Sequence, residues 1–165
     1  MIETLQRFGD VVIADVAQGR NMYQMPLNVF CVVDGAGRTR NVAYVVQDRQ
    51  DHDAHQWALQ QLVSASGSKP SVIMSDQDAA FMSAYPNRRS WAAAWTRTQF
   101  TANTRTTGRV ESENGVNKML SSRKTTLMEL FPRLLQRAAQ QGDSGDGNSS
   151  FLSRNADAVE DYFQE

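Results

Sequence analysis

The chain has 165 residues, of which 41% are apolar and 21% are charged. This suits one ordinary domain with a core and excludes a wholly disordered or fibrous chain. Its 17 Lys and Arg residues nearly balance its 18 Asp and Glu residues, so net charge favours no class of partner. No apolar run reaches the length of a membrane span, and the single Cys31 excludes an internal disulfide and a thiolate zinc cluster.

The first part of the chain predicts three strands joined by short connections, after a short amphipathic opening segment. Residues 10–16 form a compact, β-branched apolar run that predicts a buried strand. Residues 25–34 predict a second strand, and the Asp-Gly pair at 34–35 favours a tight hairpin into a third strand at 39–47. We therefore expect an antiparallel meander.

A helix and a fourth strand follow the meander. Residues 48–66 have helical periodicity, with Asp51 or Asp53 available as the cap, and their apolar members are Trp57, Leu59, Leu62 and Val63. Residues 71–76 predict a strand. A helix that crosses over between strands normally places the next strand parallel to an existing one. If that neighbour is the first strand, Asp15 and Asp76 end adjacent parallel strands.

The second half of the chain is mainly helical. Helices are expected at residues 76–85, ended by Pro86, at 109–122 and at 126–141, whereas residues 87–108 have no clear assignment. The last helix carries Leu127, Leu130, Leu134 and Leu135 on one side. The sequence thus predicts an α/β domain with a mixed sheet over residues 1–140 and a flexible acidic tail over residues 141–165.

Carboxylates at strand ends are the most informative feature of the sequence. A buried carboxylate needs a partner, and Mg²⁺ takes such hard oxygen ligands. A third carboxylate on a nearby helix would complete a two-metal site for phosphoryl transfer. Helical spacing would put Glu111, Asn114 and Lys118 on one face. The alternatives are that Asp15 caps the following turn, that Asp76 is a helix N-cap, and that Glu111 is an ordinary first-turn acid.

Basic residues concentrate in the middle of the chain. Residues 86–125 contain 8 Lys or Arg and 2 Glu (Glu111 and Glu113), a charge near +6, between two acidic flanks. Arginine binds phosphate in a bidentate manner, so this block predicts contacts with a DNA backbone, the alternative being a solvated surface without a partner. The candidate contacts are Arg88, Arg89, Arg97, Arg105, Arg109 and Lys118.

Other chemistry-bearing residues have simpler interpretations. His52 and His55 could bind a metal, but two imidazoles without further ligands are more often surface polar residues. Cys31 lies in a strand and is expected to be a small buried hydrophobe. Trp91 and Trp95 are expected to pack in a core rather than to stack on bases.

The chain resembles a known family, the MULE transposase domain of Mutator-like elements. The resemblance rests on IADVAQGRNMYQMPLNVFCVVDGAGR around Asp15, on SDQDAAFMSAYP around Asp76, and on FTANTRTTGRVESENGVNK around Glu111. It covers about residues 8 to 135. The separate motifs are weak, but their order and spacing together are fairly specific.

This resemblance implies a ribonuclease-H-like mixed sheet, three antiparallel strands plus a parallel fourth with flanking helices. It also implies a catalytic and metal-binding triad of Asp15, Asp76 and Glu111, with Glu113 as the second choice for the third ligand. Two Mg²⁺ (or Mn²⁺) ions would activate water to cut a phosphodiester, and the freed 3′-hydroxyl would attack target DNA. Transposon ends and target DNA are the implied partners and the nucleus is the implied location, while the oligomeric state stays open.

The chain departs from the family pattern after Asp76. Only 35 residues separate Asp76 from Glu111, and residues 86–100 contain none of the family's Cys and His residues. We therefore expect a truncated or decayed copy that lacks the family's fifth strand and helical insertion. Two alternatives follow: a domesticated, non-catalytic DNA-binding or interaction module, and a gene fragment without activity.

Overall fold

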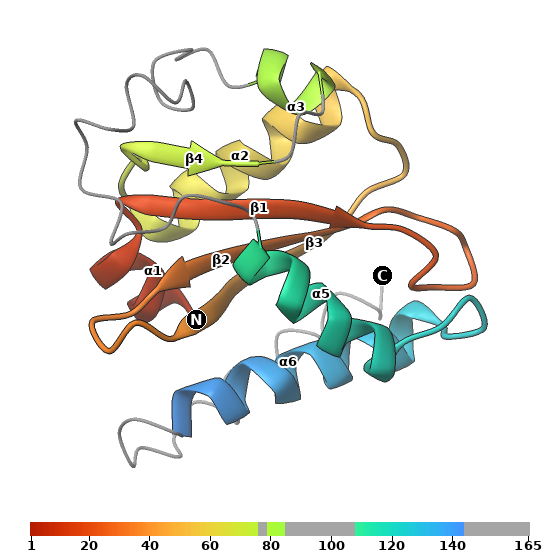
Figure 1. Cartoon of the computed structure of the whole chain (residues 1–165). Coiled ribbons are helices and arrows are strands. Elements are labelled where there is room, and N and C mark those ends of the chain that lie inside the picture. Colours follow the sequence, from red (N-terminus) through yellow and green to blue (C-terminus); the bar gives the residue numbers. More distant parts are fainter. Residues whose placement is uncertain (76–78, 85–107, 144–165) are drawn as a thin grey trace.

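A four-stranded mixed sheet organises the computed structural model, which describes residues 1–75, 79–84 and 108–143 (Figure 1). The strand order is β3-β2-β1-β4. β1 pairs antiparallel with β2 and parallel with β4, and β2 pairs antiparallel with β3. The strands are β1 (Val11–Ala17), β2 (Leu27–Val33), β3 (Thr39–Val46) and β4 (Val72–Met74). The predicted meander and its parallel fourth strand are confirmed.

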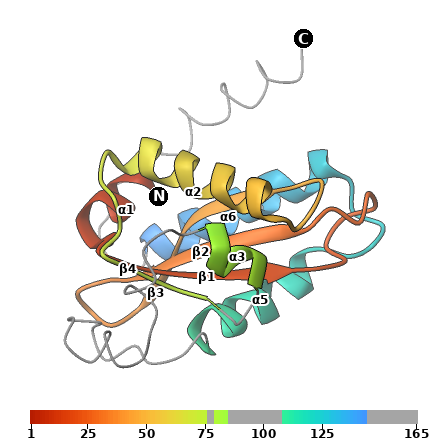
Figure 2. The ribbon, with the colours of Figure 1, turned by 90° about the horizontal axis from the view of Figure 1, so that it is seen from above.

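Helices cover both faces of this sheet, as the two ribbon views show (Figures 1 and 2). One face carries α1 (Ile2–Phe8), α2 (His52–Ser66) and α3 (Ala79–Ala84). The other face carries α5 (Gly108–Leu120) and α6 (Leu127–Asp143). α6 continues three residues past the predicted domain boundary at 140, and the rest of the predicted tail lies outside the described residues.

The sheet separates two apolar cores, because successive strand residues point to opposite faces. In β1, Val12 and Ala14 pack with α1, α2 and α3 residues in one core, whereas Ile13 and Ala17 pack with α6 residues in the other. Both faces of β1 are thus covered, which explains why its sequence is an almost continuous apolar run rather than an alternating one.

The hairpin between β2 and β3 is organised by Asp34. Its Oδ1 accepts hydrogen bonds from the backbone N–H groups of Ala36 and Arg38, and its Oδ2 pairs with the Arg38 and Arg40 side chains at 3.0 and 2.9 Å. Burial raises the pKa of Asp34, but these hydrogen bonds outweigh it and lower the pKa to about 2. The predicted tight turn is confirmed, with Gly37 at a φ of +75° that L residues rarely adopt.

α2 begins at Asp51, one of its two predicted caps, and buries only part of the apolar residues named from the sequence. Asp51 is the N-cap, and its side chain accepts a hydrogen bond from the Ala54 N–H at 3.0 Å. Leu59 and Leu62 are buried as expected, but Trp57 is 50% exposed. The prediction that His55 is a surface residue is wrong, since it is fully buried. The buried members of the helix, spaced at three and four residues, are His55, Ala58, Leu59, Leu62 and Ser66.

α6 supplies the apolar layer below the sheet. Leu130 and Leu134 are fully buried, and Leu127 packs against them at the start of the helix, so the predicted apolar side is confirmed for these three residues. None of the helices in the described ranges is long and apolar enough to cross a membrane.

Removing one buried leucine of α6 tests this layer. We expect Leu134→Ala to lower the free energy of unfolding by about 2–5 kcal/mol, because it removes transferred apolar surface and leaves a cavity. Met128→Ala, in the same helix at a side chain that is 58% exposed, should change it by less than about 0.5 kcal/mol. Urea denaturation measures both values. Equal effects of the two substitutions would contradict the packing described here.

Candidate functional site

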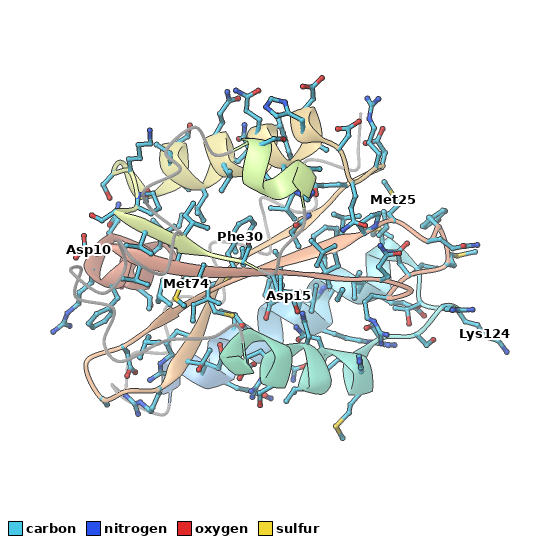
Figure 3. The ribbon with its side chains drawn as sticks, turned by 45° about the horizontal axis from the view of Figure 1, so that its top comes forward. Asp10, Asp15, Met25, Phe30, Met74 and Lys124 are labelled. Atoms are coloured by element: carbon cyan, nitrogen blue, oxygen red, sulfur yellow. The ribbon has the colours of Figure 1, made fainter. Side chains whose placement is uncertain are left out.

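Asp15 lies near the carboxyl end of β1, on the face of the sheet that α5 and α6 cover. It alternates with Ile13 and Ala17, whose side chains belong to the core below the sheet, and its neighbour on β2 is Val29. Figure 3 shows the Asp15 side chain on the α5 side of β1. A half-buried carboxylate at this position requires polar partners.

The first of these partners is an amide on α5. The Asn114 Nδ2 donates a hydrogen bond to Asp15 Oδ2 at 2.5 Å, and the backbone N–H of Val16 donates to Asp15 Oδ1 at 2.9 Å. Asn114 is only 5% exposed, and its Oδ1 is buried without a hydrogen-bond partner among the described residues. One side chain thus fixes α5 against β1 and leaves a buried acceptor oxygen beside the carboxylate.

Glu113, the preceding residue of α5, has a different environment. Its carboxylate accepts hydrogen bonds from the Arg137 guanidinium of α6 at 3.1 and 3.2 Å and from Asn41 Nδ2 of β3 at 3.2 Å. Only 12% of the Glu113 side chain and 25% of the Arg137 side chain are exposed. This ion pair therefore joins α5, α6 and the sheet in a setting where solvent screens the charges weakly.

Asn41 extends this polar contact across β3. Its backbone N–H donates to Gln141 Oε1 at 2.8 Å, and its Oδ1 accepts a hydrogen bond from Cys31 Sγ at 3.0 Å. Burial raises the pKa of the Cys31 thiol, and the nearby carboxylates of Glu113 and Asp15 raise it further. Cys31 is fully buried, as predicted, and remains a neutral thiol rather than a nucleophilic thiolate.

The described residues include only part of the predicted triad. Asp15 lies within the described residues, Asp76 lies outside them, and for Glu111 the structure describes the α5 backbone but not the side chain. Within the described parts of the chain, no group of three His, Cys, Asp or Glu side chains is arranged to hold a metal ion. The triad therefore stays a prediction.

The same division applies to the predicted DNA contacts. Lys118 is an exposed residue in the last turn of α5. The described residues do not include Arg88, Arg89, Arg97 and Arg105, the side chain of Arg109, or the two tryptophans Trp91 and Trp95.

Sequence reasoning missed the polar contact formed by Asn41, Glu113 and Arg137. Each residue comes from a different element, and no local pattern links positions separated by 72 and 24 residues. One signal was present, since Asn41 is a polar residue directly before the apolar residues Val42 to Val46 of a predicted strand. A polar residue at a buried strand position needs a hydrogen-bond partner from a neighbouring layer.

The sequence of this chain matches one known protein family. The model of the MULE transposase domain family matches residues 11–96, just over half of the chain. The chain belongs to the MULE transposase domain family. Neither the curated proteins nor the solved structures that were searched contain a match.

The matched range fits the architecture of the domain. It contains all four strands, together with Asp15 and Asp76, and it ends before α5 begins. Membership of the MULE family indicates a transposase-related function and implies an interaction with DNA. MULE transposases are generally dependent on divalent metals. The oxygen donors found here, the Asp15 carboxylate and the adjacent Asn114 Oδ1, are of the hard type that Mg²⁺ prefers.

The ion pair between α5 and α6 can be tested through stability. We expect Arg137→Met to lower the free energy of unfolding by about 1–3 kcal/mol, because it leaves the Glu113 carboxylate largely buried without its cation. Glu113→Gln in the same background should recover part of the loss, since it removes the uncompensated charge. Chemical denaturation of the single and double variants measures both effects.

Arg49→Met provides the matched control for that experiment. Arg49 also pairs with carboxylates, those of Asp48 and Asp51, but its side chain is 68% exposed. A surface pair contributes only about 0–1 kcal/mol. A loss at Arg49 as large as that at Arg137 would contradict the special role of the buried pair.

Proposed function

We propose that this MULE domain is a metal-dependent DNA-cleaving and strand-transferring domain of ribonuclease-H-like fold, with Asp15, Asp76 and Glu111 as its metal ligands. The parallel pairing of β1 with β4 is the observation that carries the proposal. A meander followed by a crossover helix and a parallel strand is also the arrangement that the family resemblance implied, which supports the ribonuclease-H-like assignment.

The register of β1 and β4 supports Asp15 and Asp76 as a pair. Val11 pairs with Val72, and Ile13 pairs with Met74, so partners differ by 61 positions in the sequence. Asp15 and Asp76 differ by the same 61 positions. Each aspartate stands two residues beyond the last observed pair, and residues two apart in a strand share a face. A continued register would bring both carboxylates to one side of the sheet.

Contacts of α5 support Glu111 over Glu113 as the third ligand. The Arg137 guanidinium neutralises the charge of Glu113, and hydrogen bonds from Arg137 and Asn41 occupy its carboxylate oxygens. Glu111 stands three residues before Asn114, the residue that contacts Asp15. Residues three apart lie on the same helix face, one turn from each other. Helical geometry therefore favours Glu111, in the first turn of α5, as the third metal ligand.

The described residues would orient the reacting groups in this mechanism. Bound divalent ions would supply an activated water and stabilise the leaving oxygen. Asn114 and the Val16 N–H each donate to one oxygen of the Asp15 carboxylate and so restrict its orientation. The Glu113–Arg137 pair holds α5 and α6 together and cancels the charge of Glu113. These contacts fix the helix that carries the third ligand.

A second candidate function is a non-catalytic DNA-binding module. It is favoured by the exposed Lys118 at the end of α5, which could contact phosphates without any carboxylate. Action in the nucleus remains a prediction from the family resemblance for both candidates.

A nicking assay separates the two functions. We expect the chain to nick supercoiled DNA in the presence of Mg²⁺ or Mn²⁺. Asp15→Asn and Asp76→Asn should each reduce the rate about 100-fold or more, because each removes metal-dependent transition-state stabilisation of several kcal/mol. Gel electrophoresis of the plasmid measures the nicked fraction over time.

Asp48→Asn serves as the control, because this exposed aspartate follows β3 and makes only a surface ion pair at 3.5 Å. It should leave the nicking rate unchanged. Nicking that persists in both variants, or in the presence of EDTA, would reject the proposed site. DNA binding without any nicking would favour the non-catalytic module.

A further inference from the structure

Two loops far apart in the sequence lie against each other beyond the carboxyl end of β1. The first connects β1 to β2 (residues 18–26) and the second connects α5 to α6 (residues 121–126). The Met22 N–H donates a hydrogen bond to the Thr125 backbone oxygen at 2.8 Å. A Cβ at Gly19 would lie 3.3 Å from Arg123 Nε, so the Arg123 side chain crosses directly over the first loop. Both ribbon views place these loops at the same edge (Figures 1 and 2).

Internal hydrogen bonds hold both loops in a defined shape. In the first loop, the fully buried Asn21 side chain donates to the Met25 oxygen at 2.7 Å and accepts from the Tyr23 and Met25 N–H groups at 3.1 Å. In the second loop, the buried Thr125 Oγ1 accepts from the Ser122 N–H at 2.9 Å. The surface is therefore largely organised before any ligand binds, which lowers the entropy cost of binding.

The two segments that form this edge bring four cations together, beside the Glu129 carboxylate, which accepts hydrogen bonds from the Thr126 N–H and Oγ1 at 2.9 and 3.2 Å. Residues 18–26 and 118–126 contain four cations and no Asp or Glu. Lys118, Arg123 and Lys124 are exposed, and Arg20 is half-exposed with its Nε donating to the Gln18 oxygen at 2.9 Å. None of these four cations is in an ion pair with a carboxylate of the described residues. Figure 3 shows Lys124 and Met25 at this edge and Asp10, which precedes β1, at the opposite one.

These charges lie within a few nucleotides' reach of Asp15. Arg20 follows Asp15 by five residues, and an extended chain spans at most about 18 Å over that length. Nucleotides of one strand are spaced about 3.4 Å apart along a duplex, so roughly five nucleotides cover this distance. A DNA backbone held at the loops can therefore extend to the carboxylate.

We infer that Arg20, Lys118, Arg123 and Lys124 form one phosphate-binding surface that holds duplex DNA next to the carboxyl end of β1. The choice of DNA as the polyanion rests on the proposed function, whereas the surface itself rests on the contacts between the two loops. Its contacts are to phosphates, so it positions DNA without reading a sequence. Of the six DNA contacts predicted from the sequence, only Lys118 belongs to this surface.

Salt-dependent binding of the full chain to a labelled duplex tests this surface. Fluorescence anisotropy in EDTA measures the binding constant over a series of salt concentrations. The triple variant Arg20→Gln, Arg123→Gln and Lys124→Gln should bind more weakly at every salt concentration. The slope of log K against log salt should fall in magnitude by about 2.7, because each lost phosphate contact removes about 0.9. A variant with Lys at both arginine positions should keep the original slope.

A triple variant at the other end of β1 provides the control. Arg7→Gln, Arg38→Gln and Lys69→Gln remove the same charge from α1, from the β2–β3 hairpin and from the segment before β4. This variant should leave the slope unchanged. Thermal unfolding followed by circular dichroism confirms that each variant is folded, and only folded variants are compared.

The outcomes separate the surface from the proposed cleavage. Equal slopes for the two triple variants would overturn the assignment of the surface. Binding of polyglutamate as tight as that of DNA at equal salt would overturn DNA as its partner and indicate an acidic protein. Because binding is measured without divalent metal, a chain that fails to nick DNA but shows the expected slope change would support the surface and reject only the cleavage activity.

Discussion

The hydrogen bond between Asn114 and Asp15 connects helix α5 to strand β1 of the sheet. Asp15 belongs to the central strand of the described sheet, and Asn114 belongs to a helix 99 residues later. An amide that donates to a half-buried carboxylate satisfies the carboxylate without neutralising its charge. The contact therefore holds α5 on the sheet. An arginine in place of Asn114 would hold the helix but cancel the charge.

Glu113, the residue before Asn114 in α5, is a carboxylate that pairs with a cation. Its charge is cancelled by Arg137, and its oxygens are occupied by hydrogen bonds from two elements. Neighbouring polar residues of α5 thus make separate contacts: Asn114 donates to a carboxylate of β1, and Glu113 joins α5 to α6 and β3. Had both been left charged and unpaired, the repulsion between Asp15 and Glu113 would weaken the docking of α5.

Sequence periodicity predicts the strands of the sheet well, but it does not predict the polar contacts between the sheet and the helices α5 and α6. The strands around Ile13 and Phe30 are long apolar runs, and the Asp34 turn has a local signature, so their order and pairing follow from local rules. The surface prediction for His55 is wrong because it rested on the usual exposure of an imidazole, and helical spacing alone does not decide which side of α2 faces the sheet. The contact of Asn41 with Glu113 depends on how α5 docks, which no local pattern encodes.

The division of the core by the sheet has a consequence for access to Asp15. The layer above the sheet is anchored by apolar residues such as Leu59 and Leu62, whereas α5 below the sheet is anchored largely by amide, carboxylate and guanidinium groups. Local opening costs less where few apolar side chains are buried. α5 can therefore separate transiently while the upper layer and the apolar contacts of α6 stay folded. Backbone amides of α5 would then exchange with solvent through a partial opening, and water or an ion would gain a wider route to the half-buried Asp15 carboxylate without global unfolding.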